Sequence, residues 1–165
     1  MIVELVRLLL QALFFWSARD TELMIMYTLK AGAAFDSAHF LAGYNGKCRN
    51  IHGHRWTVEA EFCGNELCAD GDKRGMLIDF GDLKRELREI AEQFDHALIY
   101  ERGSLKEKTL AALEDEGFRL IEIPFRPTAE NLARMFYDKL AEKGMPVCEI
   151  TVYETPDNCA SYRKD

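Results

Sequence analysis

The sequence lacks an excess of positive charge. Its 165 residues include 21 Lys and Arg against 28 Asp and Glu, so the formal net charge is −7. Proteins that bind nucleic acids usually carry a basic patch or stripe, and this balance argues against that class. Apolar residues make up 48% and charged residues 30% of the chain, which excludes collagen-like and low-complexity proteins. The length favours one domain, at about 100–200 residues per domain.

The chain also lacks an even number of cysteines. The chain has five and no C-x-x-C pair: Cys48, Cys63, Cys68, Cys148 and Cys159. A small secreted scaffold would carry an even number at short spacings. We therefore expect free thiols in a reducing cytoplasm, most of them as small core residues.

The apolar stretch near the N-terminus is too short to span a membrane. It reads LLLQALFFW over Leu8–Trp16, whereas a span needs about 20 apolar residues. It is interpreted as an appended helix, as an extension upstream of a native start at Met24 or Met26, or as a cleaved signal peptide. We favour the first two and expect residues 1–25 to be a dispensable extension, residues 26–165 to be the domain, and no membrane partner.

Apolar residues in the rest of the chain recur with two different periods. Residues 52–63 alternate between apolar and polar, which is typical of a half-buried antiparallel strand. Residues 82–94 carry one helical stripe. Further strands are predicted at 27–40, 118–123, 147–154 and 160–163, and further helices at 104–117 and from Thr128 to Gly144. Strands, then helices, then strands predict an α+β fold with an antiparallel sheet and helices on one face.

Three of the four histidines lie within sixteen residues: His39, His52 and His54. Side chains two positions apart on a strand project from one face, at a rise of about 3.4 Å per residue, so His52 and His54 share a face. A hairpin through the loop at 41–51 would place His39 beside them. Three neutral imidazoles with an open fourth position form a catalytic zinc site. Unconnected histidines are the alternative, which this clustering disfavours.

Three further features are candidates for chemistry, and each has a passive alternative. Cys48 lies in the same loop between two cationic neighbours that favour a thiolate, but a passive loop cysteine fits equally well. Asp95 could orient the adjacent His96 for proton transfer, or the two could simply cap a helix. Glu154 ends an apolar strand, where it could accept two N–H groups from a guanine-like ring edge or lie in solvent.

Six segments, taken together, resemble the family of 6-pyruvoyl-tetrahydropterin and 6-carboxytetrahydropterin synthases. They occur in family order and cover the chain from about residue 26 to residue 163: FDSAH at 35–39, CRNIHGH at 48–54, LIDF at 77–80, DHAL at 95–98, PTAEN at 127–131 and VYET at 152–155.

The resemblance implies the tunnelling fold. Each subunit would have a four-stranded antiparallel sheet with two main helices on one face. Three subunits would close a barrel, and two trimers would form a homohexamer with active sites at subunit interfaces. The implied site has zinc ligands His39, His52 and His54, catalytic residues Cys48, Asp95, His96 and Glu154, and a pterin-binding pair made of Glu154 and Thr128.

The spacing Cys48-x-x-x-His52-Gly-His54 and the short loop after His39 are similar to the carboxy-synthase branch, which acts in queuosine biosynthesis. That resemblance implies a cytoplasmic zinc-dependent lyase whose substrate is 7,8-dihydroneopterin triphosphate. A pyruvoyl-tetrahydropterin synthase is the nearest alternative, and a non-catalytic zinc-stabilised assembly protein is another. A third branch has glutamate at the position of Cys48 and is disfavoured. The stretch 101–126 is longer than is usual in the family and is expected to carry an extra helix over the site.

Overall fold

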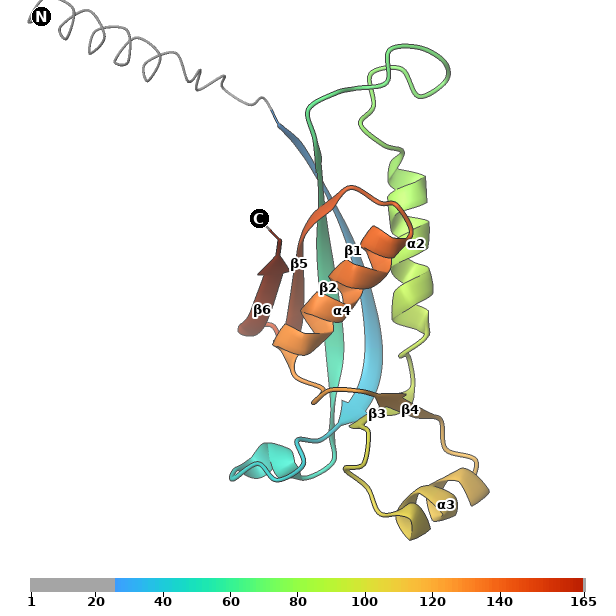
Figure 1. Cartoon of the computed structure of the whole chain (residues 1–165), viewed down its shortest axis with the longest axis vertical. Helices are drawn as coiled ribbons and strands as arrows, with labels where there is room; N and C mark the ends of the chain where they lie inside the picture. The colour runs from blue at the N-terminus through green and yellow to red at the C-terminus, as the bar shows by residue number, and fades with distance from the viewer. Residues whose placement is uncertain (1–25, 165) are drawn as a thin grey trace, which may run out of the picture.

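The computed structural model describes residues 26–164, which form one curled sheet with helices against it (Figure 1). The expected N-terminal extension, residues 1–25, lies outside the described residues. Within 26–164, none of the helices combines the length and the apolar character that crossing a membrane would require.

A long hairpin forms the centre of the sheet, as the loop at 41–51 predicts. Strand β1 (Tyr27–His39) pairs in antiparallel register with β2 (His52–Gly64), from Tyr27 opposite Gly64 to His39 opposite His52. The connecting loop contains a short 3-10 turn, η1 (Lys47–Arg49). The hairpin therefore ends with two histidines directly across from each other.

The sheet is larger than the resemblance implies. Strands β5 (Val147–Thr155) and β6 (Asn158–Arg163) extend the hairpin in antiparallel fashion, which gives the four expected strands. Two short strands, β3 (Ala97–Glu101) and β4 (Leu120–Ile123), add to the other edge in parallel with β1. The expected four-stranded antiparallel sheet is therefore a six-stranded mixed sheet in the order β4-β3-β1-β2-β5-β6. β4 lies within the strand predicted at 118–123, whereas β3 and the parallel direction of both strands were not predicted, because a segment of five residues shows no clear period.

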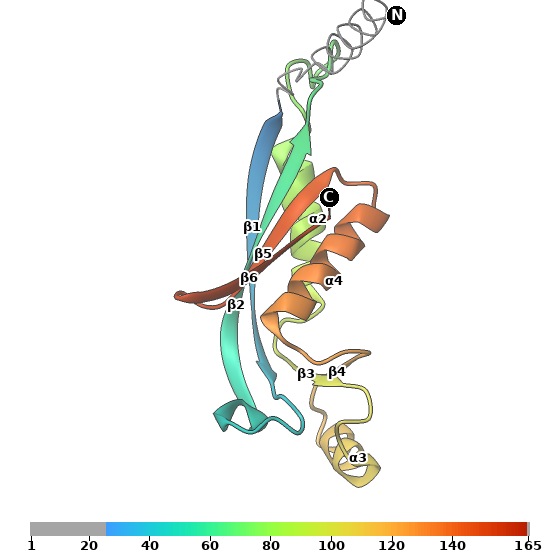
Figure 2. The same ribbon diagram turned by 60° about the vertical axis from the view of Figure 1, so that its left-hand side comes forward.

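Two helices cover one face of the sheet, as expected. They are α2 (Phe80–Glu92) and α4 (Ala129–Glu142), and Figure 2 shows both on the same side of the strands. Asp79 caps α2 by accepting a hydrogen bond from the Gly81 amide, and Thr128 caps α4. Each helix buries one apolar stripe against the sheet: Leu83, Leu87 and Ile90 from α2, and Leu132, Phe136 and Leu140 from α4.

The long stretch at 101–126 does carry a third helix, α3 (Glu107–Asp115), but α3 has no buried residue. It lies at the end of the molecule near β3 and β4, away from the layer formed by α2 and α4 (Figure 1). Leu113 and the exposed Phe118 line a hollow of about 460 Å³ that His96 also lines. The extra helix therefore stands beside His96 and not over the histidine cluster.

Two cysteines correct the expectation of free thiols. Cys63, at the end of β2, forms a disulfide with Cys148, near the start of β5, and their Cα atoms lie 5.8 Å apart. The partners are 85 residues apart in sequence, so neither their number nor their local spacing could reveal the pair. Cys48, Cys68 and Cys159 are free thiols.

Candidate active site

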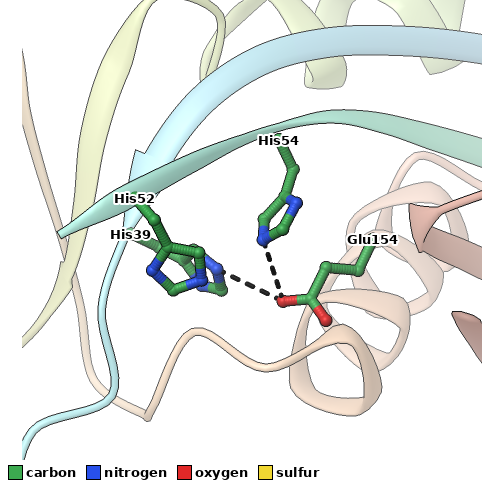
Figure 3. Close-up of side chains that lie close together, drawn as sticks. All are labelled: His39, His52, His54 and Glu154. Carbon is green, nitrogen blue, oxygen red and sulfur yellow. Dashed lines mark ion pairs between the residues drawn. The ribbon is translucent and has the colours of Figure 1, made fainter. Parts of the chain in front are cut away.

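The hairpin places three imidazoles together on one side of the sheet. His39 and His52 are directly paired across β1 and β2, and His54 follows on the same face of β2. The ring centroids are 4.5 Å apart for His39 and His52, 5.2 Å for His39 and His54, and 5.0 Å for His52 and His54. Figure 3 shows the three side chains gathered beside the strands. The period-two pattern of β2 thus produces the predicted cluster.

Backbone carbonyls fix which ring nitrogens face the cluster. The Nδ1 atom of His39 lies 2.7 Å from the Pro127 carbonyl oxygen, and the Nδ1 atom of His52 lies 2.8 Å from the Asn50 carbonyl oxygen. A carbonyl oxygen only accepts hydrogen bonds, so Nδ1 carries the proton and Nε2 carries a lone pair in both neutral rings. Metal-binding histidines usually show this arrangement.

The Nε2 atoms of His39, His52 and His54 are all buried and have no hydrogen-bond partner within residues 26–164. Buried polar atoms are normally hydrogen-bonded, so three buried nitrogen atoms without a partner at one place require an explanation. Three neutral imidazoles are a donor set that binds transition metals well. The residues therefore fit a metal ion.

Glu154 completes this cluster. One carboxylate oxygen, Oε1, lies 3.2 Å from Nε2 of His39 and 3.4 Å from Nε2 of His54 (Figure 3). One atom from each of the four side chains lies within 4.8 Å of the others, so the group could hold a metal ion. Glu154 was expected to bind substrate, and its place among the metal-binding atoms was missed. Its position in step with the core residues Ile150 and Val152 was the signal that could have revealed this.

Burial keeps two of these histidines in the form that binds metals. It lowers the pKa of His39 below its usual value of 6.5, against smaller opposing effects of the Pro127 carbonyl and Glu154. Burial also lowers the pKa of His54. Removal from water disfavours the charged imidazolium, so both rings are neutral at pH 7.

Cys48 lies at the tip of the hairpin, in η1, and is half-buried. Its carbonyl oxygen accepts a hydrogen bond of 2.8 Å from the Leu41 amide, which closes the loop that joins His39 to His52. Within residues 26–164, the side chains that could share a metal ion are His39, His52, His54 and Glu154.

Asp95 and His96 form a hydrogen-bonded pair just before β3. The Nδ1 atom of His96 lies 2.7 Å from Oδ2 of Asp95, and Oδ1 of Asp95 accepts a 2.8 Å hydrogen bond from the Asp36 amide. That amide is the largest cause of a lowered pKa of Asp95, followed by His96. His96 is the one non-glycine residue of 26–164 with a positive φ, 51°. A carboxylate and an unusual backbone conformation thus orient its exposed ring.

Within one chain, His96 and His54 line different hollows. His96 lines the hollow beside α3 together with Asp36, Ser37 and Ala38 of β1. His54 and Glu154 instead line a separate hollow of about 620 Å³. Within residues 26–164, these two hollows share no lining residue.

Thr128 caps α4 next to the residue that holds His39. Its hydroxyl oxygen accepts a hydrogen bond from the Asn131 amide at the start of α4. The preceding residue, Pro127, supplies the carbonyl that holds His39. A backbone carbonyl leaves no mark in a sequence, so this contact could not have been predicted.

Comparison with known proteins identifies the family of this chain. The family model described as 6-pyruvoyl tetrahydropterin synthase matches residues 28–165. The chain belongs to the 6-pyruvoyl tetrahydropterin synthase family. This is a family of enzymes that act on a small-molecule pterin.

Among its relatives, the 6-carboxy-5,6,7,8-tetrahydropterin synthase of Haemophilus influenzae is 34% identical over 142 residues, which cover 84% of this chain and 100% of the relative. The Rickettsia felis protein of the same name is 34% identical over 131 residues, 76% of this chain and 91% of the relative.

Solved structures have the same fold. An uncharacterised protein from Wolinella succinogenes matches with a TM-score of 0.66 and 19% identity, over 86% of this chain and 99% of that one. The 6-pyruvoyltetrahydropterin synthase of Plasmodium vivax matches with a TM-score of 0.62 and 21% identity, over 85% of this chain and 98% of that one.

Proposed function

We propose that this chain is a 6-carboxy-5,6,7,8-tetrahydropterin synthase. It would convert 7,8-dihydroneopterin triphosphate and water into 6-carboxytetrahydropterin, acetaldehyde and triphosphate, as a step of queuosine biosynthesis in the cytoplasm. The observation that carries the proposal is the set of three buried Nε2 atoms of His39, His52 and His54, in a chain whose relatives bear that name.

The metal we propose is zinc, held by His39, His52 and His54. Nitrogen donors in a four-coordinate site with one exchangeable position are typical of catalytic zinc. When bound there, zinc would supply Lewis acidity toward the hydroxyl groups of the substrate side chain. The carbonyls of Pro127 and Asn50 would hold two of the rings in the orientation that binding needs.

The remaining residues would move protons and hold the pterin. Cys48, as a thiolate, would remove a proton from the substrate side chain. His96, oriented by Asp95 at 2.7 Å, would exchange protons on the other side. Glu154 would accept charge-assisted hydrogen bonds from the N–H groups of the pterin ring, and the segment around Thr128 would lie against that ring.

A homohexamer of two trimers is part of the proposal. His96 lines one hollow of the chain, and His54 and Glu154 line another. An active site between subunits would let the Asp95–His96 pair of one chain act beside the histidine cluster of another. Measurement of the oligomeric state, together with recovery of activity on mixing inactive Cys48→Ala and His96→Ala chains, would test this arrangement.

The function is tested by incubating the purified zinc-loaded protein with 7,8-dihydroneopterin triphosphate. Mass spectrometry should detect 6-carboxytetrahydropterin, and an alcohol dehydrogenase assay should detect one acetaldehyde per product. A 6-pyruvoyl-tetrahydropterin product without acetaldehyde would assign the chain to the alternative named by the family model. No product of either kind would favour a zinc-stabilised assembly protein.

A further inference from the structure

The contact between Glu154 and His39 is unfavourable without a cation. Its Oε1 atom lies 3.2 Å from Nε2 of His39 and 3.4 Å from Nε2 of His54, yet neither contact has the geometry of a hydrogen bond. The Nδ1 proton of His39 is directed at the Pro127 carbonyl, so its Nε2 atom presents a lone pair to the carboxylate. Lone pairs facing a carboxylate at this distance repel unless a cation lies between them.

The fold builds this contact into the sheet. Glu154 follows Ile150 and Val152 in the alternation of β5, and both of those residues are fully buried against the helices. The pleat therefore directs the Glu154 carboxylate to the histidine side of the sheet. Across residues 26–164, the only ion-pair partners of Glu154 within 4.0 Å are His39 and His54. Neither lysine nor arginine neutralises it there.

The two distances agree with ligands that share one metal ion. Zinc bonds to nitrogen and oxygen are about 2.0–2.1 Å long, so neighbouring ligand atoms in a tetrahedral site lie about 3.3 Å apart. The separations of 3.2 and 3.4 Å fall on either side of that value. Glu154 is thus at ligand distance from two of the three histidines and within 4.8 Å of the third.

We propose that Glu154 is the fourth ligand of the metal in the substrate-free protein, and that a bound pterin takes the carboxylate away from the metal. This inference rests on the proposed function, because it gives the pterin-binding glutamate a second partner. Four protein ligands close a zinc site, whereas catalysis needs an exchangeable position. Hydrogen bonds from the N–H groups of the pterin ring would replace the bond between the Glu154 carboxylate and the metal. The fourth coordination position of the metal would therefore open only when substrate is bound.

The first test is the zinc affinity of the substrate-free protein, measured by competition with a chromophoric chelator. Because even the hydrogen-bonding partners of ligands change metal affinity by about 10–100-fold, Glu154→Ala should weaken zinc binding at least about tenfold, and Glu154→Gln should weaken it less. Glu149→Gln is the matched control. Glu149 lies on the same strand with similar exposure, but projects from the other face toward Arg163. Equal zinc affinity of wild type and Glu154→Ala, both with native melting curves, would overturn the inference.

The second test uses the cobalt-loaded protein, whose visible absorption reports the ligands. Azide should bind to the metal of Glu154→Ala at least about tenfold more tightly than to that of the wild type, since it must displace a protein ligand only in the latter. Neopterin, an unreactive oxidised pterin, should change the cobalt spectrum of the wild type. If fluorescence shows that neopterin binds while the cobalt spectrum stays constant, the pterin does not take the Glu154 carboxylate away from the metal, and that part of the inference is wrong.

These readouts do not depend on turnover. A wild type that shows both effects but forms no product would refute the proposed function and leave the fourth ligand in place. Normal product formation by a wild type whose zinc affinity matches that of Glu154→Ala would refute the fourth ligand and leave the function in place.

Discussion

The protein uses imidazole beside carboxylate in two places with opposite surroundings. His39, only 1% exposed, has its Nδ1 atom at a backbone carbonyl, and its Nε2 atom faces two other rings and Glu154. The His96 side chain is 80% exposed, and its Nδ1 atom faces the carboxylate of Asp95. In the proposed function, the first arrangement would gather lone pairs for a cation, whereas the second would hold one ring ready for proton transfer. Burial and the partner of Nδ1, not the residue type, separate these two roles.

Removing one imidazole ring from each place should give the largest difference between them. His52→Ala and His54→Ala should lower the zinc content from one ion per chain to background, with affinity reduced by more than about 100-fold. His96→Ala should retain full zinc content, because its ring lines another hollow. Elemental analysis of purified proteins measures this. Wild-type zinc in both cluster variants would refute the metal site.

Variants of Cys48 test whether the hairpin loop takes part in catalysis. Cys48→Ala should bind zinc normally but lose about 10²–10⁴-fold in turnover, the usual contribution of a general base. Cys48→Ser should also be slow, because a hydroxyl loses its proton far less readily. The Cys48 thiol should react with iodoacetamide faster than the free thiols of Cys68 and Cys159. Wild-type turnover by Cys48→Ala would remove Cys48 from the mechanism.

The charge of Asp95 should affect turnover but not the zinc content. Asp95→Asn would still accept the hydrogen bond from the Asp36 amide but would no longer orient His96 with a charge. We expect turnover to fall about 10–100-fold at unchanged zinc content. Steady-state kinetics and elemental analysis of the same preparation test this. A parallel loss of zinc would instead show that the two places are structurally linked.

Acid should lower the folding stability of the metal-free protein, because burial in the folded chain disfavours the protonated forms of His39 and His54. Burial lowers the pKa of His39 and His54 below 6.5 in the folded chain, so the unfolded chain takes up protons first as the pH falls. Stability is therefore full above about pH 6.5 and declines as the pH falls from there toward the lowered folded values. Melting temperatures of metal-free protein between pH 7.5 and 5 should fall by a few degrees, and less so in His54→Gln. An equal decline in the variant would contradict this.

The N-terminal stretch should have the smallest effect. A chain that begins at Met24 should keep the zinc content, the oligomeric state and the turnover of the full chain, because the family match starts at residue 28. Size-exclusion chromatography and product assays compare the two. Loss of folding on truncation would show that the apolar residues belong to the core.

The alternation of residues along β2 determined by itself which face the histidines share, because a strand leaves its side chains only two directions. The loop at 41–51 located the hairpin, and the helical pattern that begins at Thr128 located α4. The motifs around Cys48 and Asp95 identified the family but not where these residues lie relative to the metal.

Contacts between segments that are far apart in the sequence arise only from the folded arrangement of the chain. The Pro127 carbonyl reaches His39 across 88 residues, and Cys63 meets Cys148 across 85. The parallel strands β3 and β4, and the place of Glu154 beside the histidines, depend on how the sheet closes around its core. Local sequence patterns determine the direction in which a side chain projects, whereas the packing of strands and helices determines what that side chain meets, and the chemistry of this site depends on both.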